Sequence, residues 1–179
     1  MADSTTREKR SQMVTGMFRD RDSAEQAYRS ITDRGYNRDD VNLLMSEDTR
    51  KKHFASDEAA DTELGNKALE GAGAGSAIGG TVGAILALVA AAGTLAIPGL
   101  NIVAAGPIVA ALTGAGAGGL AGGLIGALVG WGIPEERAKA YESGIKEGGI
   151  VMGVNPRSDE DADYFEQEWK NSRGEQIYR

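Results

Sequence analysis

Apolar side chains near the beginning of the chain recur at the spacings typical of strands and helices. The runs QMVTGMF at 12–18 and VNLLM at 41–45 are short and apolar, which predicts two strands. Between them, apolar residues fall on one face of a predicted helix: Ala24, Ala27, Tyr28 and Ile31. We expect Asp22 to cap this helix, Glu25 to complete a capping box and Gly35 to end it.

A similar pattern returns near the end of the chain. The run IVMGV at 150–154 predicts a strand, Ser158 is placed to cap a following helix with Asp161 at the box position, and 176–178 can form a short last strand. One face of that helix carries Ala162, Phe165 and Trp169. The two ends align with an offset of 138 residues, which makes them a weak internal repeat.

Two β-α-β halves predict an α+β fold, a ferredoxin-like βαβ-(α)βαβ sandwich that is split by an inserted Gly/Ala-rich helical hairpin. The bracketed helix begins near Pro134, whose missing N–H costs nothing in a first helical turn, and it carries an apolar stripe of Ala138, Tyr141 and Ile145. The predicted segments are a polar tail 1–11, a first half 12–46, a polar segment 47–70, a hairpin 71–133 and a second half 134–179. Within the polar segment we expect a loop, followed by a helix from about Ser56.

The predicted hairpin rests on the placement of its glycines. Residues 71–134 carry no charge and hold 18 of the 26 glycines. Many of these are spaced by four, in the series Gly71, Gly75, Gly79, Gly83 and the series Gly114, Gly118, Gly122, Gly126, Gly130. Residues four apart share a helix face, and such a small-residue stripe lets two helix backbones approach closely. We expect these glycines to mediate helix packing and oligomerisation.

Two breaks divide this stretch into arms. Pro98 and Gly99, and then Gly106 and Pro107, interrupt any helix. The arms, near 76–97 and 108–131, would be roughly 33 and 36 Å long as helices, which is about the thickness of a bilayer core. The intervening tip, 98–107, is uncharged.

The flanks of the hairpin suggest an orientation in a membrane. Trp131 falls where an interfacial aromatic residue would lie, and Lys67, Arg137 and Lys139 flank the base, which places the base on the cytoplasmic side. The arms are only marginally hydrophobic, however, because Gly and Ala dominate them. A soluble assembly with hairpins buried in a shared core therefore remains open, as does a disordered low-complexity segment.

Composition excludes several classes of chemistry. The chain of 179 residues has no Cys and one His, which excludes a disulfide scaffold, a thiolate metal site, a Cys nucleophile and a multi-His metal site. A net charge of −7 argues against a nucleic-acid partner. The polar start has no apolar core of a secretory signal, so we expect a cytoplasmic chain.

No residue pattern predicts a catalytic, cofactor-binding or metal-binding site. The G-x-G-x-x-G match at 114–119 lacks both a preceding strand and an acidic residue about 20 positions later. Asp159, Asp161 and Asp163 alternate without the glycine of a calcium loop, and a helix start explains them. The sequence around His53 predicts a solvated loop residue. The neighbouring cations can attract anionic headgroups or form a solvated face; they are Arg50, Lys51 and Lys52.

The chain resembles the bacterial general stress proteins and the cyanobacterial low-temperature-induced proteins over nearly its whole length. The resemblance lies in VTGMFRDRDSAEQAYRSITDRGY, VNLLM, GNKALEGAGAGSAIGG, AIPGL and, most specifically, GALVGWGIPEERAKAYESGIKEGGIVMGV. It implies an α/β stress-protein module split by a Gly-zipper hairpin, induction by cold, osmotic or desiccation stress, and no established enzyme activity or catalytic residue.

These observations together predict a non-enzymatic stress-response protein that self-associates through its hairpin, inserted in or lying on the cytoplasmic side of the inner (cytoplasmic) membrane. Its partners are then further copies of itself and the lipid bilayer, without a cofactor. The alternative is a soluble cytoplasmic homo-oligomer forming a shell, tube or particle. A third hypothesis, that the protein is a small-ligand sensor, rests on fold analogy alone.

Overall fold

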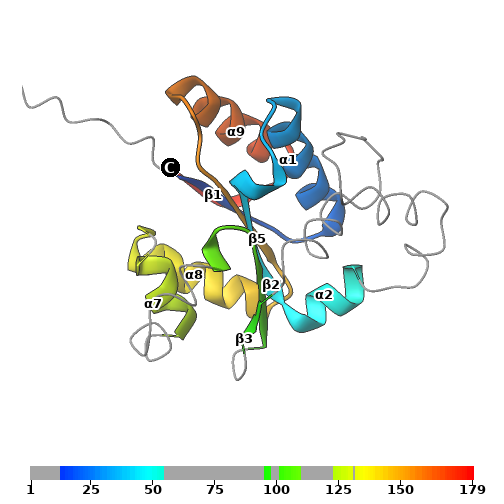
Figure 1. Ribbon diagram of the computed structural model, residues 1–179. Helices are drawn as coiled ribbons and strands as arrows, with labels where there is room; N and C mark the ends of the chain where they lie inside the picture. Colours follow the sequence, from blue (N-terminus) through cyan, green and yellow to red (C-terminus); the bar gives the residue numbers. More distant parts are fainter. Residues whose placement is uncertain (1–12, 55–94, 98–100, 110–122, 131) are drawn as a thin grey trace, which may run out of the picture.

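The computed structural model describes residues 13–54, 95–97, 101–109, 123–130 and 132–179, which form an α+β structure around one antiparallel sheet (Figure 1). Its elements are β1 (Val14–Phe18), α1 (Arg21–Asp33), the 3-10 helix η1 (Arg38–Asp40), β2 (Val41–Ser46), α2 (Glu47–Phe54), β3 (Leu95–Ile97), β4 (Ile102–Ala105), α7 (Gly123–Gly130), α8 (Glu135–Lys146), β5 (Ile150–Val154), α9 (Asp159–Asn171) and β6 (Glu175–Tyr178).

The sheet interlocks the two ends of the chain. Its six strands lie in the order β3-β4-β2-β5-β1-β6, and every neighbouring pair is antiparallel. The β1-α1-β2 unit therefore places two parallel strands on either side of β5, and the β5-α9-β6 unit places two parallel strands on either side of β1. Val14 and Val41 both pair with Val154, so the register of β5 is fixed from both sides.

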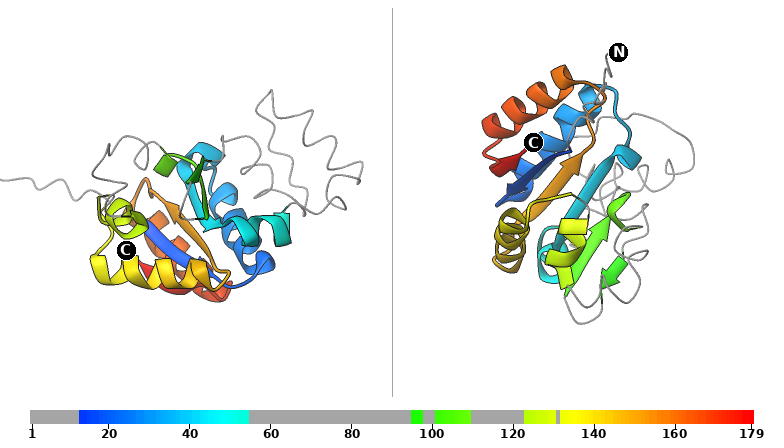
Figure 2. Two further views of the ribbon diagram at one scale, coloured as in Figure 1. Left: turned by 90° about the horizontal axis from the view of Figure 1, so that it is seen from below. Right: turned by 90° about the vertical axis from the view of Figure 1, so that its left-hand side faces the viewer.

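Both faces of the sheet are covered by helices. Figure 2 shows α1 (blue) and α9 (orange) together on one face and α8 (yellow) on the other. Successive strand residues point to opposite faces, so Phe18 packs under α1 and α9 whereas Met17 packs against α8. Because both faces are buried, the central strands are apolar at almost every position, which is why they appear as continuous apolar runs in the sequence.

Trp169 is the centre of the face under α1 and α9. The indole is fully buried and meets the ring of Phe18 edge-on, at 5.7 Å between centroids. A Cβ atom on Gly16 would lie only 3.0 Å from the indole, so this strand position leaves room for the ring. The indole Nε1 has no hydrogen-bond partner among the described residues, so Trp169 stabilises the fold through apolar packing.

The opposite face is held by α8. Tyr141 is fully buried; its hydroxyl donates to the carbonyl oxygen of Gln176 (2.7 Å) and shares a hydrogen bond with Oγ1 of Thr15 (2.8 Å). Burial raises the pKa of Tyr141 to about 12. A Cβ on Gly144 would lie 1.9 Å from Sδ of Met17, so the helix approaches β1 closely at this position.

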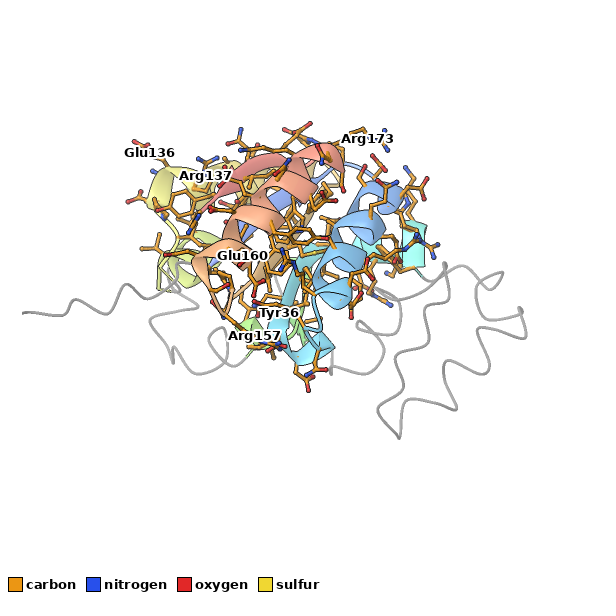
Figure 3. All side chains as sticks on the ribbon, turned by 90° about the horizontal axis from the view of Figure 1, so that it is seen from above. Tyr36, Glu136, Arg137, Arg157, Glu160 and Arg173 are labelled. Atoms are coloured by element: carbon orange, nitrogen blue, oxygen red, sulfur yellow. The ribbon has the colours of Figure 1, made fainter. Side chains whose placement is uncertain are left out.

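A polar contact joins the N-terminal and C-terminal halves of the chain just after the C-terminal end of β5. The Tyr36 hydroxyl donates to Oδ2 of Asp161 (2.6 Å) and accepts from the backbone N–H of Arg157 (2.6 Å). The Arg157 guanidinium lies 4.0 Å from the centre of the Tyr36 ring, and Figure 3 shows these two side chains side by side. Burial, and then the carboxylate of Asp161, raise the pKa of Tyr36.

The predicted helix faces are confirmed, but one predicted cap is wrong. Ser158 caps α9 as expected, accepting from the backbone N–H of Asp161, and Gly35 follows α1 with a φ of +77°. The α1 cap is Asp20, not Asp22, because its carboxylate accepts from the backbone N–H of Ser23. Pro134 lies just before α8 rather than within its first turn.

The predicted loop after β2 is also wrong, because residues 47–54 form α2. Ser46 Oγ accepts from the backbone N–H of Thr49, and the Glu47 carboxylate bonds to Arg50 one turn later. These local bonds stabilise a helix that has almost no apolar periodicity and only one large buried side chain, Phe54. The helix that we expect from about Ser56 lies outside the described residues.

Parts of the predicted helical hairpin belong to the sheet and its α8 face. Leu95–Ile97, the expected end of the first arm, is β3, and Ile102–Ala105, within the expected tip, is β4. β4 pairs with the edge of β2, and both Ile102 and Ala104 pack on the α8 face. These runs form strands because a short apolar run beside an open strand edge satisfies its backbone N–H and C=O groups by pairing with that edge.

The close packing after β4 depends on Gly106. This residue has a φ of +91°, and a Cβ there would lie 2.1 Å from the carbonyl oxygen of Val41. Asn42, buried in β2, then accepts from the backbone N–H of Ile108 (2.7 Å). Of the predicted break residues, Gly106 and Pro107 thus follow a strand, while Pro98 and Gly99 lie outside the described residues.

The burial of Trp169 predicts a large effect of its truncation. Trp169→Ala should lower the free energy of unfolding by about 3–5 kcal/mol, because it opens a cavity beside Phe18. Trp169→Phe should cost less, since no hydrogen bond of the indole is lost. Urea unfolding measures both, with Gln167→Ala on the exposed side of α9 as control. Equal losses for Trp169→Ala and Gln167→Ala would contradict this assignment of the core.

Candidate functional site

A hollow of about 420 Å³ lies at the end of the sheet where β2 leads into α2 and α8 leads into β5. Its wall comes from four segments that are far apart in the sequence. The polar side chains in it are Arg19, Ser46, Asp48, Thr49, Lys52, His53, Asn101, Lys146 and Glu147. Ile102 and Ile145 also border it, but both are buried in the core. The hollow therefore combines cations, carboxylates and neutral polar groups.

The first turn of α2 is anchored to the turn before β4. The backbone N–H of Glu47 donates to the carbonyl oxygen of Asn101 (2.9 Å), and Nδ2 of Asn101 donates to Asp48 (3.2 Å). Hydrogen bonding to Arg50 keeps the pKa of Glu47 below its usual range. These contacts fix the start of the helix, and Lys52 and His53 follow one turn later at the hollow.

Arg19 closes the hollow on the side of β1. Its Nη1 lies 2.8 Å from Glu147 and its Nε lies 2.9 Å from Glu175, so one guanidinium links β1 to the end of α8 and to β6. The hydrogen bond from Arg19 lowers the pKa of Glu147, and the two carboxylates raise the pKa of Arg19. Glu147 is therefore ionised and already engaged.

The two lysines of the hollow differ in their surroundings. Lys146 pairs with Glu142 on its own helix at 2.8 Å. Lys52 forms no ion pair within the part of the chain that the structure describes, although it follows Asp48 by four residues. Its ammonium group is thus available at the rim of the hollow.

His53 is held neutral by its surroundings. Partial burial, followed by the positive charges of Lys52 and Arg21, lowers the pKa of the imidazole, while Asp20 opposes the shift. The backbone carbonyl oxygen of His53 accepts from Nη1 of Arg21 (3.0 Å), which ties α2 to the start of α1. A neutral imidazole offers one N–H donor and one acceptor.

The predicted membrane-interface residues are separated by the structure. Arg50 and Lys51 both pair with Glu47, whereas Lys52 lines the hollow. Trp131 lies outside the described residues. The basic cluster is therefore not one uniform face: two of its cations stabilise α2 and the third remains available.

Two of the nine predicted packing glycines lie within the described residues. Gly126 and Gly130 lie on α7, where an added Cβ would meet no atom of the described residues within 4 Å. The other predicted glycines lie outside the described residues: Gly71, Gly75, Gly79, Gly83, Gly114, Gly118 and Gly122.

The inner side of α7 packs on α8. Leu124 and Leu128 are buried in the same cluster as Ala138, Tyr141 and Ile145. The outer side of α7 bears Gly126, Gly130 and Val129, and Val129 is 42 % exposed. We call these three residues the open face of α7; it is the second candidate site.

Several residues of the hollow carry no signal in the sequence. Arg19, Asn101 and Glu147 lie in different segments and reach the hollow only because β1, β4 and α8 meet at this end of the sheet. The prediction that His53 is a solvated loop residue is wrong, because His53 lies on α2, is half-buried and borders the hollow.

Two general observations bear on both candidate sites. Among the described ranges, no three side chains of His, Asp or Glu converge as metal ligands. Within the same ranges, no helix combines the length and the apolar character needed to cross a membrane.

In comparisons with known proteins, no family model, no curated protein and no solved structure matches the chain significantly.

The electrostatics of His53 predict a pH dependence. We expect its pKa to lie below 6.5, and the free energy of unfolding to fall as the pH drops through this value, because the unfolded chain binds the proton more readily. His53→Gln should remove this dependence. Because the chain has one His, a single NMR signal reports the titration.

Lys52→Gln should raise the pKa of His53 by removing a repelling charge, whereas the neighbouring Lys51→Gln should leave it nearly unchanged. A pKa at or above 6.5 in the unchanged chain, or equal shifts in the two variants, would refute this account of the site.

Proposed function

We propose that this chain is a non-enzymatic stress-response protein that associates with copies of itself through the open face of α7. The observation that carries the proposal is the division of α7 into a leucine side packed on α8 and a glycine side where an added Cβ would meet no described residue within 4 Å. Gly126 is half-buried and Gly130 is exposed, and glycines four residues apart on one helix face allow a second helix to approach closely. The stress-response part rests on the sequence resemblance.

The composition of α7 supports association rather than a purely internal role. The helix is GLIGALVG, without a charged or polar side chain, although one of its sides does not belong to the core. An exposed helix of a monomer normally carries polar residues on its outer side. Apolar atoms and bare backbone on that side gain stability when another apolar surface covers them.

We further propose that the module is ferredoxin-like. The order β6-β1-β5-β2 and the position of α1 and α9 on one face support this assignment. In this interpretation β3, β4, α7 and α8 are additions to the basic module. The additions cover the face that would otherwise expose Met17, Leu44 and Val151.

We propose the cytoplasmic side of the inner membrane as the location, with a soluble cytoplasmic assembly as the alternative. The long uncharged stretch supports contact with lipid, and its glycine spacing supports contact with protein. Fractionation with a carbonate wash distinguishes the two: a membrane-inserted chain stays in the pellet, whereas a soluble assembly sediments by size and is insensitive to detergent.

Substitution of Gly126 tests self-association. In Gly126→Leu the Cβ of the new side chain meets no described residue, so the fold should be retained, and the better helix former should stabilise α7 by up to about 1 kcal/mol. Association should nevertheless weaken, because a leucine prevents close approach of a second backbone. Sedimentation velocity without detergent measures the assembly, and thermal unfolding measures the fold.

Gln167→Leu provides the matched control, since it adds the same side chain to the exposed side of α9. Its assembly state should equal that of the unchanged chain. A species near 18.7 kDa for the unchanged chain, or no difference between the two leucine variants, would refute association through α7.

A further inference from the structure

We propose that the hollow between α2 and α8 binds a small anion, whose phosphate or carboxylate group is held at Lys52 and His53. Three features of the hollow support this proposal: its volume, its cation that pairs with no described residue, and the backbone of its wall. It is independent of the proposed self-association.

The volume of the hollow fits a small metabolite. About 420 Å³ lies at the lower end of the range of ligand pockets, which is about 300–1,000 Å³. Ile102 and Ile145 border the hollow but are buried in the core, so the accessible wall is mainly polar. A small polar anion therefore suits the hollow better than a ligand with a large apolar part.

The free groups of the wall are those that bind anions. Glu147 is engaged by Arg19, and Asp48 accepts from Asn101. Ser46 and Thr49 hydrogen-bond to each other. Lys52 forms no ion pair with any residue in the described ranges, and the His53 imidazole can donate one N–H. An incoming anion therefore meets two donors that no neighbouring carboxylate has already neutralised.

The wall contains one backbone conformation that is uncommon for its residue type. Asn101, at a φ of 52°, is one of three described residues other than glycine in the left-handed region. Asn101 is kept there by its bonds to Glu47 and Asp48. Such conformations cost free energy and persist only where the surrounding contacts fix them.

The test uses inorganic phosphate and acetate as probes on the full-length chain, at constant ionic strength and neutral pH. Isothermal titration calorimetry measures the binding of each probe, and the NMR signal of the single His reports whether the probe reaches the hollow. We expect saturable binding of at least one probe, together with a shift of the His53 signal. Preference for phosphate or acetate identifies the anionic group.

Lys52→Gln should weaken binding about three- to fivefold, the size of one partly solvated charge interaction. Lys51→Gln removes the same charge one residue earlier, outside the hollow, and should leave binding unchanged. Asp48→Asn should strengthen binding, because it removes a negative charge from the wall.

Three results would overturn the proposal. One is the absence of saturable binding with both probes. Another is an equal loss of affinity in Lys51→Gln and Lys52→Gln, which indicates general charge attraction. The last is binding to phosphatidylglycerol vesicles but not to either soluble probe, which would assign these cations to a lipid surface.

Discussion

The ladder between β1 and β5 joins residues 14–18 to residues 150–154, and all other elements take their positions from it. β2 and β6 pair with its outer edges, α1 and α9 pack over one side, and α8 packs over the other. The pairing closes a very long loop, but each doubling of loop length adds only about 0.6 kcal/mol of closure cost. A long segment between the halves is therefore tolerated, provided that both halves keep their strands.

The elements that the sequence predicts correctly are those with strong local patterns. The α1 and α9 faces, the Ser158 cap and the β5 run each depend on residues within a few positions of one another. The sequence did not predict α2, because this helix is stabilised by its cap and by Glu47 rather than by an apolar stripe. The sequence did not predict β4, because a short apolar run does not show whether a strand edge is available for it to pair with.

The two candidate sites also differ in whether their residues are close together or far apart in the sequence. The spacing of Gly126 and Gly130 is local, and it indicated a helix face that the structure places away from the core. The hollow is non-local: Arg19, Asn101 and Glu147 come together only after the sheet has formed. Glycine also differs in its surroundings here, because Gly106 and Gly144 permit close contacts within the chain, whereas an added Cβ on Gly126 or Gly130 would meet no described residue within 4 Å.

The interlocked strand order has a consequence for synthesis on the ribosome. β1 and β2 leave the exit tunnel early, but the strand that lies between them is made only more than one hundred residues later. At about 5–20 residues per second, this delay lasts roughly 5–20 s. Throughout that time the first β-α-β unit holds two apolar strands with a gap between them, and chaperones or neighbouring nascent chains have access to it before β5 arrives.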